Sequence, residues 1–259
     1  MAGIDHQCWK LKNLSIGVTI LGSAAMYATT ERACAGYLVE TEGRTLWLDA
    51  GAGTWRNLLH HTDFTKLDGI VLSHRHPDHT SDVFQCFHAR RYGGSEPLPR
   101  IPLWAPEETI ECLMGYAQGL EDSFHINPVS QNGSVTAGDA TLSFVRMAHP
   151  VETLGVRIES DGSTLAYSSD SGPDADFEAL AEGAGLFICE ATFQDSDEEW
   201  EGHMSASQAG GLAAELGVGE LVLTHLPAGR DLGLSIAEAE GTASGVTVRL
   251  AADGLRLGV

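Results

Sequence analysis

The sequence predicts a single domain of the α+β class, built from layers of strands and helices. A length of 259 residues is common for one such domain. A hydrophobic content of 43% with 30 glycines is typical of a folded, turn-rich globular protein and argues against a disordered chain. No linker rich in proline or serine divides the chain, and no repeat of roughly 20–50 residues is visible. We therefore expect one domain over residues 1–259.

Strands are predicted where short apolar runs are bounded by glycine or by polar turn residues. This pattern gives strands at 14–21, 36–40, 45–49, 68–72, 101–105, 141–147, 154–159, 164–168, 185–189, 220–224 and 246–250. Between these strands, helices are predicted at 54–61, 80–91, 106–118, 174–182, 205–216 and 235–243. The helix at 205–216 has the clearest boundaries, because Ser205 and Gln208 form a capping box and Gly217 follows the last turn.

Five of the predicted strands deliver a histidine or a carboxylate at their carboxyl ends. Ligand sites in sheets flanked by helices gather at the carboxyl ends of strands. One such coincidence would mean little, but five of them indicate that these side chains meet in the folded protein. The residues are His74, His149, Asp170, Glu190 and His225.

The densest group of potential metal ligands lies in the stretch VLSHRHPDHTSD, which includes the end of an apolar run. Imidazole and carboxylate groups without thiolates favour Zn²⁺ and also suit Mn²⁺ or Fe. His74 and His76, two residues apart in a turn, can bind one divalent ion, whereas Asp78 and His79 point to a second position. Two such ions can hold a hydroxide between them and need a bridging carboxylate, for which Asp170 is the natural candidate. The alternative is a solvated histidine-rich loop, and the further His and Asp residues at strand ends argue against it.

The net charge of −21 disfavours a long polyanionic partner such as nucleic acid, although a local basic patch could still bind one. No lysine or arginine lies between Arg157 and Arg230, and that interval contains many acidic residues. Its densest acidic stretch, 195–201, is predicted to be a solvated loop. We therefore expect a nucleic-acid partner to be less favoured than a small molecule.

The cysteines and the apolar runs indicate the cellular compartment. The five cysteines are dispersed and form no C-x-x-C motif, which predicts free thiols in a reducing compartment. No apolar run approaches about 20 residues, so no transmembrane helix is expected. Residues 14–28 could be mistaken for a signal peptide, but their V-x-I-x-G pattern favours a first strand and a turn. We therefore expect a cytoplasmic protein with no membrane partner.

Four motifs, SHRHPDH, AHPVETLGVRI, YSSDSGP and LTHLP, occur in this order and resemble the metallo-β-lactamase fold superfamily. The motifs CEATF and GHMSASQAG further resemble its ribonuclease Z-like branch of phosphodiesterases. The resemblance covers nearly the whole chain and implies a four-layer αβ/βα sandwich with two metal ions at one edge. It implies that the first ion is bound by His74, His76 and His149 and the second by Asp78, His79 and His225, with Asp170 bridging them.

The resemblance also implies a proton donor. In the ribonuclease Z-like branch a histidine is placed to protonate the leaving oxygen, and His203 in GHMSA matches it. A metal-held hydroxide would attack phosphorus, and the departing alkoxide needs a proton that a histidine oriented by a carboxylate can donate. Glu190 in CEATF is the expected carboxylate, and the alternative is that His203 only caps the following helix. The expected catalytic residues are Asp78, His203 and Glu190.

The overall pattern most resembles small-molecule phosphodiesterases that act on cyclic nucleotides. Ribonuclease Z itself carries a protruding arm that binds tRNA, and no long, glycine-rich, basic insertion of that kind is visible in this sequence. We therefore expect hydrolysis of a small, cyclic nucleotide-like phosphodiester. A tRNA 3′-endonuclease, another hydrolase such as a lactonase or thioesterase, and a metal-binding sensor without activity are the alternatives. The resemblance also suggests a homodimer.

Overall fold

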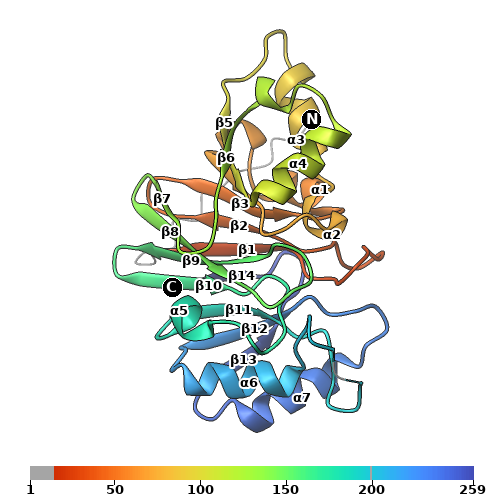
Figure 1. The fold of residues 1–259 in the computed structure, drawn as a ribbon, viewed down its shortest axis with the longest axis vertical. Helices are drawn as coiled ribbons and strands as arrows, with labels where there is room; N and C mark the ends of the chain where they lie inside the picture. The colour runs from red at the N-terminus through yellow and green to blue at the C-terminus, as the bar shows by residue number, and fades with distance from the viewer. Residues whose placement is uncertain (1–14, 199) are drawn as a thin grey trace, which may run out of the picture.

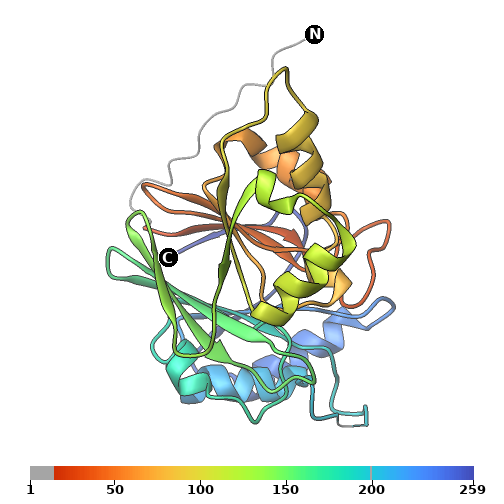
Figure 2. The same ribbon diagram turned by 45° about the horizontal axis from the view of Figure 1, so that its top comes forward.

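The computed structural model describes residues 15–198 and 200–259. Two seven-stranded sheets lie face to face, and helices cover the outer face of each sheet (Figure 1, Figure 2). The layers therefore follow the order helix, sheet, sheet, helix. This is the α+β, four-layer αβ/βα sandwich that the sequence predicts.

The first sheet comes mainly from the N-terminal half of the chain, with one strand from the C-terminus. In spatial order its strands are β14 (Arg256–Gly258), β1 (Gly17–Gly22), β2 (Gly36–Glu40), β3 (Thr45–Ala50), β4 (Gly69–Val71), β5 (Ile101–Ala105) and β6 (Phe124–Pro128). Neighbours are antiparallel from β14 to β3 and parallel from β3 to β6. The helices on its outer side, in the upper part of Figure 1, are α1 (Thr54–His61), α3 (Val83–Tyr92) and α4 (Glu107–Tyr116).

The second sheet comes from the C-terminal half. In spatial order its strands are β13 (Thr247–Leu250), β12 (Glu220–Thr224), β11 (Leu186–Glu190), β10 (Ser163–Tyr167), β9 (Leu154–Ser160), β8 (Ala140–Arg146) and β7 (Ser134–Ala137). Neighbours are parallel from β13 to β10 and antiparallel from β10 to β7. Its helices are α5 (Phe177–Ala181), α6 (Ala206–Glu215) and α7 (Leu232–Thr242), and short helical turns elsewhere are α2 (Pro77–Thr80), η1 (Phe64–Lys66) and η2 (Leu120–Asp122).

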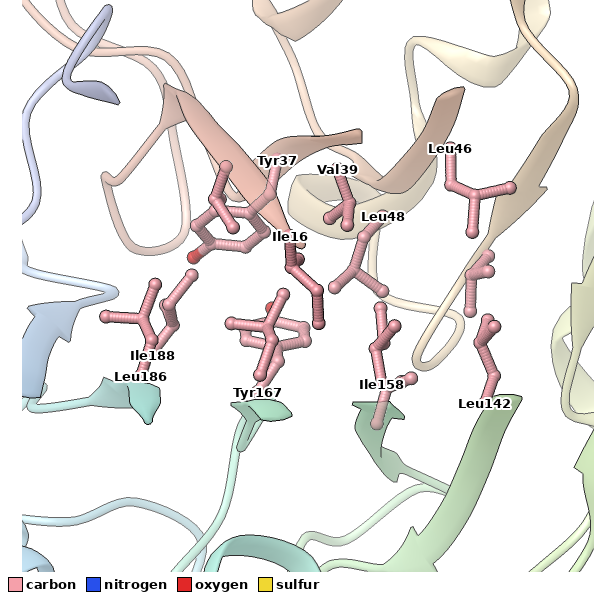
Figure 3. Packing of buried hydrophobic residues seen from close by; sticks show 14 of the residues in the cluster. Ile16, Tyr37, Val39, Leu46, Leu48, Leu142, Ile158, Tyr167, Leu186 and Ile188 are labelled. Atoms are coloured by element: carbon pink, nitrogen blue, oxygen red, sulfur yellow. The ribbon is translucent and has the colours of Figure 1, made fainter. Parts of the chain in front are cut away.

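Side chains from the inner faces of the two sheets form the central core (Figure 3). Tyr37 and Leu48 point inward from the first sheet toward Tyr167 and Ile158 of the second, and none of the four is more than 1% exposed. The rings of Tyr37 and Tyr167 lie 4.8 Å apart, centroid to centroid. One further apolar cluster lies between each sheet and the helices that cover it. Burial of apolar surface on both faces of both sheets therefore holds the four layers together.

Most predicted elements are confirmed within a few residues, and β2, β5, β12 and α1 have the predicted bounds. The capping box of Ser205 and Gln208 is confirmed, and Gly217 follows α6 with a φ of +64°, where a glycine is favoured. Three strands, β6, β7 and β14, are not predicted, and all three are edge strands. Since an edge strand packs against fewer neighbours, its sequence needs no continuous apolar run.

The predicted helix at 80–91 is wrong in its first turn, because the chain forms α2 and α3 with a break between them. Asp82 lies at this break. Its carboxylate accepts hydrogen bonds of 2.8 Å from the backbone N–H groups of Gly53 and Trp55, at the start of α1. A second boundary also differs: α7 begins at Leu232 rather than at residue 235, since Asp231 provides its N-terminal cap.

The predictions on the cysteines and on membrane spans can be compared with the described part of the chain. Residue 14, the start of the predicted first strand, and Cys8 lie outside the described residues. The cysteines within them are free thiols, as predicted: Cys34, Cys86, Cys112 and Cys189. No helix in the described part of the chain has both the length and the apolar character needed to cross a bilayer.

Replacement of Ile158 by alanine should lower the free energy of unfolding by about 2–5 kcal/mol. The side chain is fully buried between the sheets, so its truncation leaves a cavity. Ile158→Val, which removes one methyl group, should cost only about 0.5–1.5 kcal/mol. Urea unfolding of both variants and the wild type, at equal metal content, measures the difference. Equal losses from the two replacements would contradict close packing of the sheets at this position.

Candidate metal centre

The five strand-end residues predicted to meet lie together in the structure. His74, His149 and Asp170 each lie three residues beyond the end of their strand, β4, β8 and β10 respectively. Glu190 is the last residue of β11, and His225 is the first residue after β12. Strands from both sheets therefore deliver side chains to one place.

A first group of potential ligands combines His74, His76, His149 and Asp170, whose donor atoms all lie within 4.8 Å of one another. Nδ1 of His76 lies 3.0 Å from Nε2 of His74 and 3.3 Å from Nε2 of His149. Oδ2 of Asp170 lies 3.6 Å from Nε2 of His74 and 3.9 Å from Nε2 of His149. Three imidazoles and one carboxylate oxygen thus face a common point.

A second group combines Asp78, His79 and His225, with the same maximum separation of 4.8 Å between donor atoms. Oδ2 of Asp78 lies 3.4 Å from Nε2 of His225 and 3.8 Å from Nε2 of His79. Oδ1 of Asp170 lies 3.2 Å from Nε2 of His79 and 3.4 Å from Nε2 of His225. Asp170 therefore directs one carboxylate oxygen to each group.

Hydrogen bonds within the cluster leave two of its buried atoms unsatisfied. Oδ1 of Asp170 and Nε2 of His79 are buried and have no hydrogen-bond partner among the described residues, although they lie 3.2 Å apart. An unsatisfied buried polar group costs about 1–3 kcal/mol, and a cation between these atoms would satisfy both. Five imidazoles and two carboxylates also form a donor set that suits Zn²⁺, Mn²⁺ or Fe. The residues therefore fit a metal centre and could bind metal ions.

Two of the histidines are oriented by hydrogen bonds from the ring nitrogen that faces away from the cluster. Nδ1 of His79 donates to Oδ2 of Asp49 at 2.8 Å, and Nδ1 of His149 donates to the carbonyl oxygen of Gly202 at 2.9 Å. A proton held on Nδ1 leaves Nε2 with a free lone pair, which is the form that binds a metal.

Asp49 is a buried carboxylate beside the cluster that the sequence analysis did not identify. It is fully buried, and Oδ1 accepts the backbone N–H of Ser73 at 2.7 Å. Its Oδ2 accepts hydrogen bonds from the hydroxyls of Ser73 and Tyr167, each at 2.7 Å, in addition to the bond from His79. Asp49 is the penultimate residue of β3, so the strand-end pattern that revealed the other residues would also have revealed this one.

Glu190 connects a histidine of the second group to His203. Nδ1 of His225 donates to Oγ1 of Thr192 at 2.9 Å, and this hydroxyl donates to Oε2 of Glu190 at 2.8 Å. Nδ1 of His203 lies 2.7 Å from Oε1 of Glu190. The N-terminal cap of α6 is Ser205, so the alternative that His203 merely caps this helix is wrong. His203 is free to act in the site.

The pKa values of the buried groups follow from these contacts. Burial, followed by the neighbouring His79, holds the pKa of His74 well below its usual range, which keeps the ring neutral as a ligand must be. Burial opposes ionisation of Asp170, but His225 and His79 outweigh it and hold the pKa of this carboxyl well below its usual range. The carboxylate of Asp170 is therefore ionised.

The backbone around the cluster is strained. Four of the six non-glycine residues with positive φ in the described chain lie here: Met26 (+60°), Asp49 (+54°), Ser169 (+54°) and His225 (+55°). Such conformations are sparsely populated for residues with a Cβ atom and concentrate at functional sites. The backbone N–H of Met26 also donates to Oδ2 of Asp78 at 2.9 Å, which fixes that carboxylate.

Glu108, near the start of α4, connects two loops that carry ligands of the first group. Its Oε1 accepts a hydrogen bond from Nε of Arg75 at 2.7 Å, and its Oε2 accepts one from the backbone N–H of Glu152 at 3.1 Å. Arg75 lies inside the H-x-H turn, and Glu152 lies three residues after His149. The spacing of the two loops therefore depends partly on this side chain.

A cavity of about 500 Å³ opens beside His203. Among the described residues, its lining includes four carboxylates and two aromatic rings but no lysine or arginine. The lining residues are Pro173, Asp174, Phe193, Gln194, Asp195, Asp197, Trp200, Glu201, His203, Ser205, Ser207 and Gln208. The candidate proton donor, His203, therefore lines the same cavity as these four carboxylates.

Comparison with known proteins identifies the family. The chain matches the family described as "Beta-lactamase superfamily domain" over residues 44–226, which is more than half of its length and contains both ligand groups. The chain belongs to the β-lactamase superfamily. Its branch within the superfamily follows from individual relatives.

The probable metallo-hydrolase YhfI of Bacillus subtilis is 32% identical over 215 residues, which are 81% of this chain and 86% of YhfI. An uncharacterised protein of Mycobacterium tuberculosis is 33% identical over 235 residues, 86% of each chain. A ribonuclease Z of Mycolicibacterium gilvum is 28% identical over 239 residues, 81% of this chain and 84% of the other. The crystal structure of YhfI matches with a TM-score of 0.85 at 30% identity, covering 93% of this chain and 98% of YhfI. The predicted metallo-β-lactamase fold and its ribonuclease Z-like branch are thus confirmed.

Proposed function

We propose that this protein, a metallo-hydrolase of the β-lactamase superfamily, is a phosphodiesterase that uses two divalent ions to hydrolyse a small, cyclic nucleotide-like phosphodiester. The observation that carries the proposal is the position of Asp170, whose two oxygens face two separate ligand groups. A single ion would need only one of these groups. The neighbouring pair of His203 and Glu190 supplies the proton donor that an alkoxide leaving group requires.

In this proposal each ligand group would hold one ion, and Asp170 would supply one carboxylate oxygen to each group. Zn²⁺ best fits the imidazole-rich donors, and Mn²⁺ or Fe would fit the same set. When bound, the two ions would activate water and stabilise negative charge on oxygen. Asp78 would take part in this chemistry as a ligand of the second ion. The first ion is assigned to His74, His76 and His149, and the second to Asp78, His79 and His225.

His203 is assigned as the general acid. Burial disfavours the charged form, but the hydrogen bond and charge of Glu190 outweigh it and raise the pKa of His203. With Nδ1 held by Glu190, Nε2 is the atom that can donate a proton to the leaving oxygen. The ring of His203 lies 5.2 Å from those of His149 and His225, one from each ligand group.

The acidic cavity beside His203 supports a small substrate over a nucleic acid. Asp174, Asp195, Asp197 and Glu201 line it, and among the described residues only Asp197 of these four has a basic partner, Arg230 at 2.7 Å. Repulsion from these carboxylates would act on every phosphate of a polyanion but on only one phosphate of a cyclic nucleotide. The wall therefore favours substrates with a single phosphodiester.

A tRNA 3′-endonuclease is the second candidate function, favoured by the similarity to the ribonuclease Z of Mycolicibacterium gilvum. Other hydrolases of the superfamily, such as lactonases and thioesterases, are less favoured. The hydrogen-bonded pair of His203 and Glu190 matches the motif that resembles the ribonuclease Z-like phosphodiesterases, and a thioester releases a thiolate that needs no proton donor. The homodimer expected from the sequence remains part of the proposal.

The bridging role of Asp170 predicts a change in metal content. The wild type should bind about two transition-metal ions per chain, and Asp170→Ala should lower the occupancy of both sites because each oxygen faces one group. Elemental analysis of purified protein measures the content. Glu42→Ala, which removes an exposed carboxylate from the turn between β2 and β3, is the control and should leave it unchanged. One ion in the wild type, or undiminished metal in Asp170→Ala, would contradict the two-ion assignment.

A panel of substrates tests the proposed function. The purified protein should hydrolyse bis-(p-nitrophenyl) phosphate and at least one of 3′,5′-cAMP and 2′,3′-cAMP, and should act poorly on a lactone and on a pre-tRNA with a 3′ trailer. For a cyclic nucleotide, kcat/KM should depend weakly on salt concentration, because few phosphates are engaged, whereas a tRNA substrate shows a steep dependence. Efficient, salt-sensitive cleavage of the pre-tRNA without action on either cyclic nucleotide would instead favour the endonuclease.

The general-acid role of His203 predicts a dependence on the leaving group. His203→Ala should slow hydrolysis of a substrate with an alkoxide leaving group by roughly 10²–10⁴-fold. A p-nitrophenyl ester should be much less affected, because p-nitrophenolate departs without a proton. Glu190→Gln should show the same pattern more weakly, since it orients His203 without transferring the proton itself.

Metal content provides the control for this comparison. The potential ligand atoms of His203, Asp170 and His225 also lie within 4.8 Å of one another, so His203 could instead bind a metal. As a general acid, His203 can be removed with metal content unchanged. Equal rate losses on both leaving groups, or loss of metal from His203→Ala, would rule out the general-acid assignment.

A further inference from the structure

Trp200 lies beside the metal centre rather than in open solvent. Its ring centroid is 5.1 Å from that of His203 and 6.0 Å from that of His149, with a T-shaped arrangement toward His149. The side chain is nevertheless 46% exposed and lines the cavity described above. Of the described acidic residues around it, Asp195, Glu198 and Glu201 are exposed and Asp197 is partly exposed, whereas this aromatic ring packs toward the site.

Two glycines fix the position of Trp200. A Cβ atom on Gly202 would lie 2.3 Å from the indole ring, so only glycine lets the ring pack there. A Cβ atom on Gly172 would lie 1.7 Å from the carbonyl oxygen of Glu201, so this loop is pressed against the turn that follows Asp170. The backbone N–H of His203 also donates to the carbonyl oxygen of Trp200 at 3.2 Å. The indole is therefore held in place before any ligand arrives.

The polar wall of the cavity offers mainly hydrogen-bond acceptors. The carboxylates of Asp174 and Glu201 have no hydrogen-bond or ion-pair partner among the described residues, whereas Asp195 and Asp197 are bonded to Ser207 and Arg230. An ionised carboxylate can only accept hydrogen bonds, so the wall suits a ligand that carries N–H groups. A planar ligand with amino groups would match both the exposed indole face and the free carboxylates.

We infer that Trp200 is a substrate-contact residue, whose indole stacks on the nucleobase of the phosphodiester while the phosphate lies at the metal centre. The inference rests on the proposed function and names its specificity pocket. Asp174 and Glu201 accept hydrogen bonds from the base and favour bases that carry an amino group over uracil. A cavity of about 500 Å³ has room for one base beside His203.

Substrates with and without a base test the role of Trp200. Trp200→Ala should lower kcat/KM for a cyclic nucleotide by about 5- to 100-fold, mainly through KM, because stacking on the base is lost. It should leave kcat/KM unchanged for the same cyclic ribose phosphate without a base. Trp200→Phe should retain most of the activity, since a phenyl ring still stacks. Tyr116→Ala, which removes an aromatic ring that is 80% exposed outside the cavity, is the matched control and should have no effect.

Equilibrium binding separates this inference from the proposed hydrolysis. The wild type should bind AMP, and Trp200→Ala should weaken that binding while elemental analysis shows unchanged metal content. This result would support the base pocket even if no phosphodiester of the panel were hydrolysed. Absence of AMP binding to the wild type would overturn the inference. Equal rate losses on the substrates with and without a base would also overturn it, and Trp200 would then have only a structural role.

The carboxylates can be tested with two pyrimidine substrates. The wild type should prefer 3′,5′-cCMP, which has an amino group, over 3′,5′-cUMP by about tenfold or more. Asp174→Asn combined with Glu201→Gln should narrow this ratio, because amide side chains can also donate hydrogen bonds. Equal turnover of the two nucleotides by the wild type would overturn the assignment of these carboxylates to the base.

Discussion

A carboxylate buried between two sets of imidazoles is the interaction on which the rest of this centre depends. Asp170 is 2% exposed, and no lysine or arginine in the described chain forms an ion pair with it. A buried charge is stable only when it is paired or coordinates a cation. The hydrogen bonds that hold Nδ1 of His79, His149 and His225 turn each Nε2 toward Asp170. The surrounding structure thus provides lone pairs around one anion, an arrangement that is stable with cations present and poorly satisfied without them.

Around this arrangement the backbone adopts energetically unfavourable conformations. Asp49, Ser169 and His225 all have positive φ, and each such residue costs about 1–3 kcal/mol. All three lie at or near the ends of strands that the packed sheets hold on both faces. Tyr167 connects the core to the site directly, because its ring packs on Tyr37 and its hydroxyl donates to Asp49 at 2.7 Å. The core between the sheets therefore stabilises the strained turns that present the ligands.

The sequence predicts which potential metal ligands come together, because these residues follow a local rule. Each lies in the H-x-H-x-D-H turn or just beyond an apolar strand, so the pattern is visible without knowing which strands are neighbours. Of the residues that orient these histidines, Asp49 near the end of β3 follows the same rule, but others do not. Thr192 bonds to His225 across 33 positions, and Gly202 accepts from His149 across 53, contacts that exist only once the strands of the second sheet are paired. The edge strands β6, β7 and β14 are missed because their few packing contacts impose little pattern on the sequence.

The segment from residue 200 to 203 combines three tasks that are difficult to alter separately. The carbonyl oxygen of Gly202 orients His149, the side chain of His203 is the proposed acid, and the ring of Trp200 packs against Gly202. A side chain at position 202 would displace the indole and shift the carbonyl that orients a metal ligand. The carboxylates of Asp174 and Glu201 have no hydrogen-bond or ion-pair partner among the described residues. In the proposed base pocket, replacement of these exposed acids therefore leaves the contacts of Trp200, Gly202 and His203 in place, whereas a side chain at position 202 would alter two of them at once.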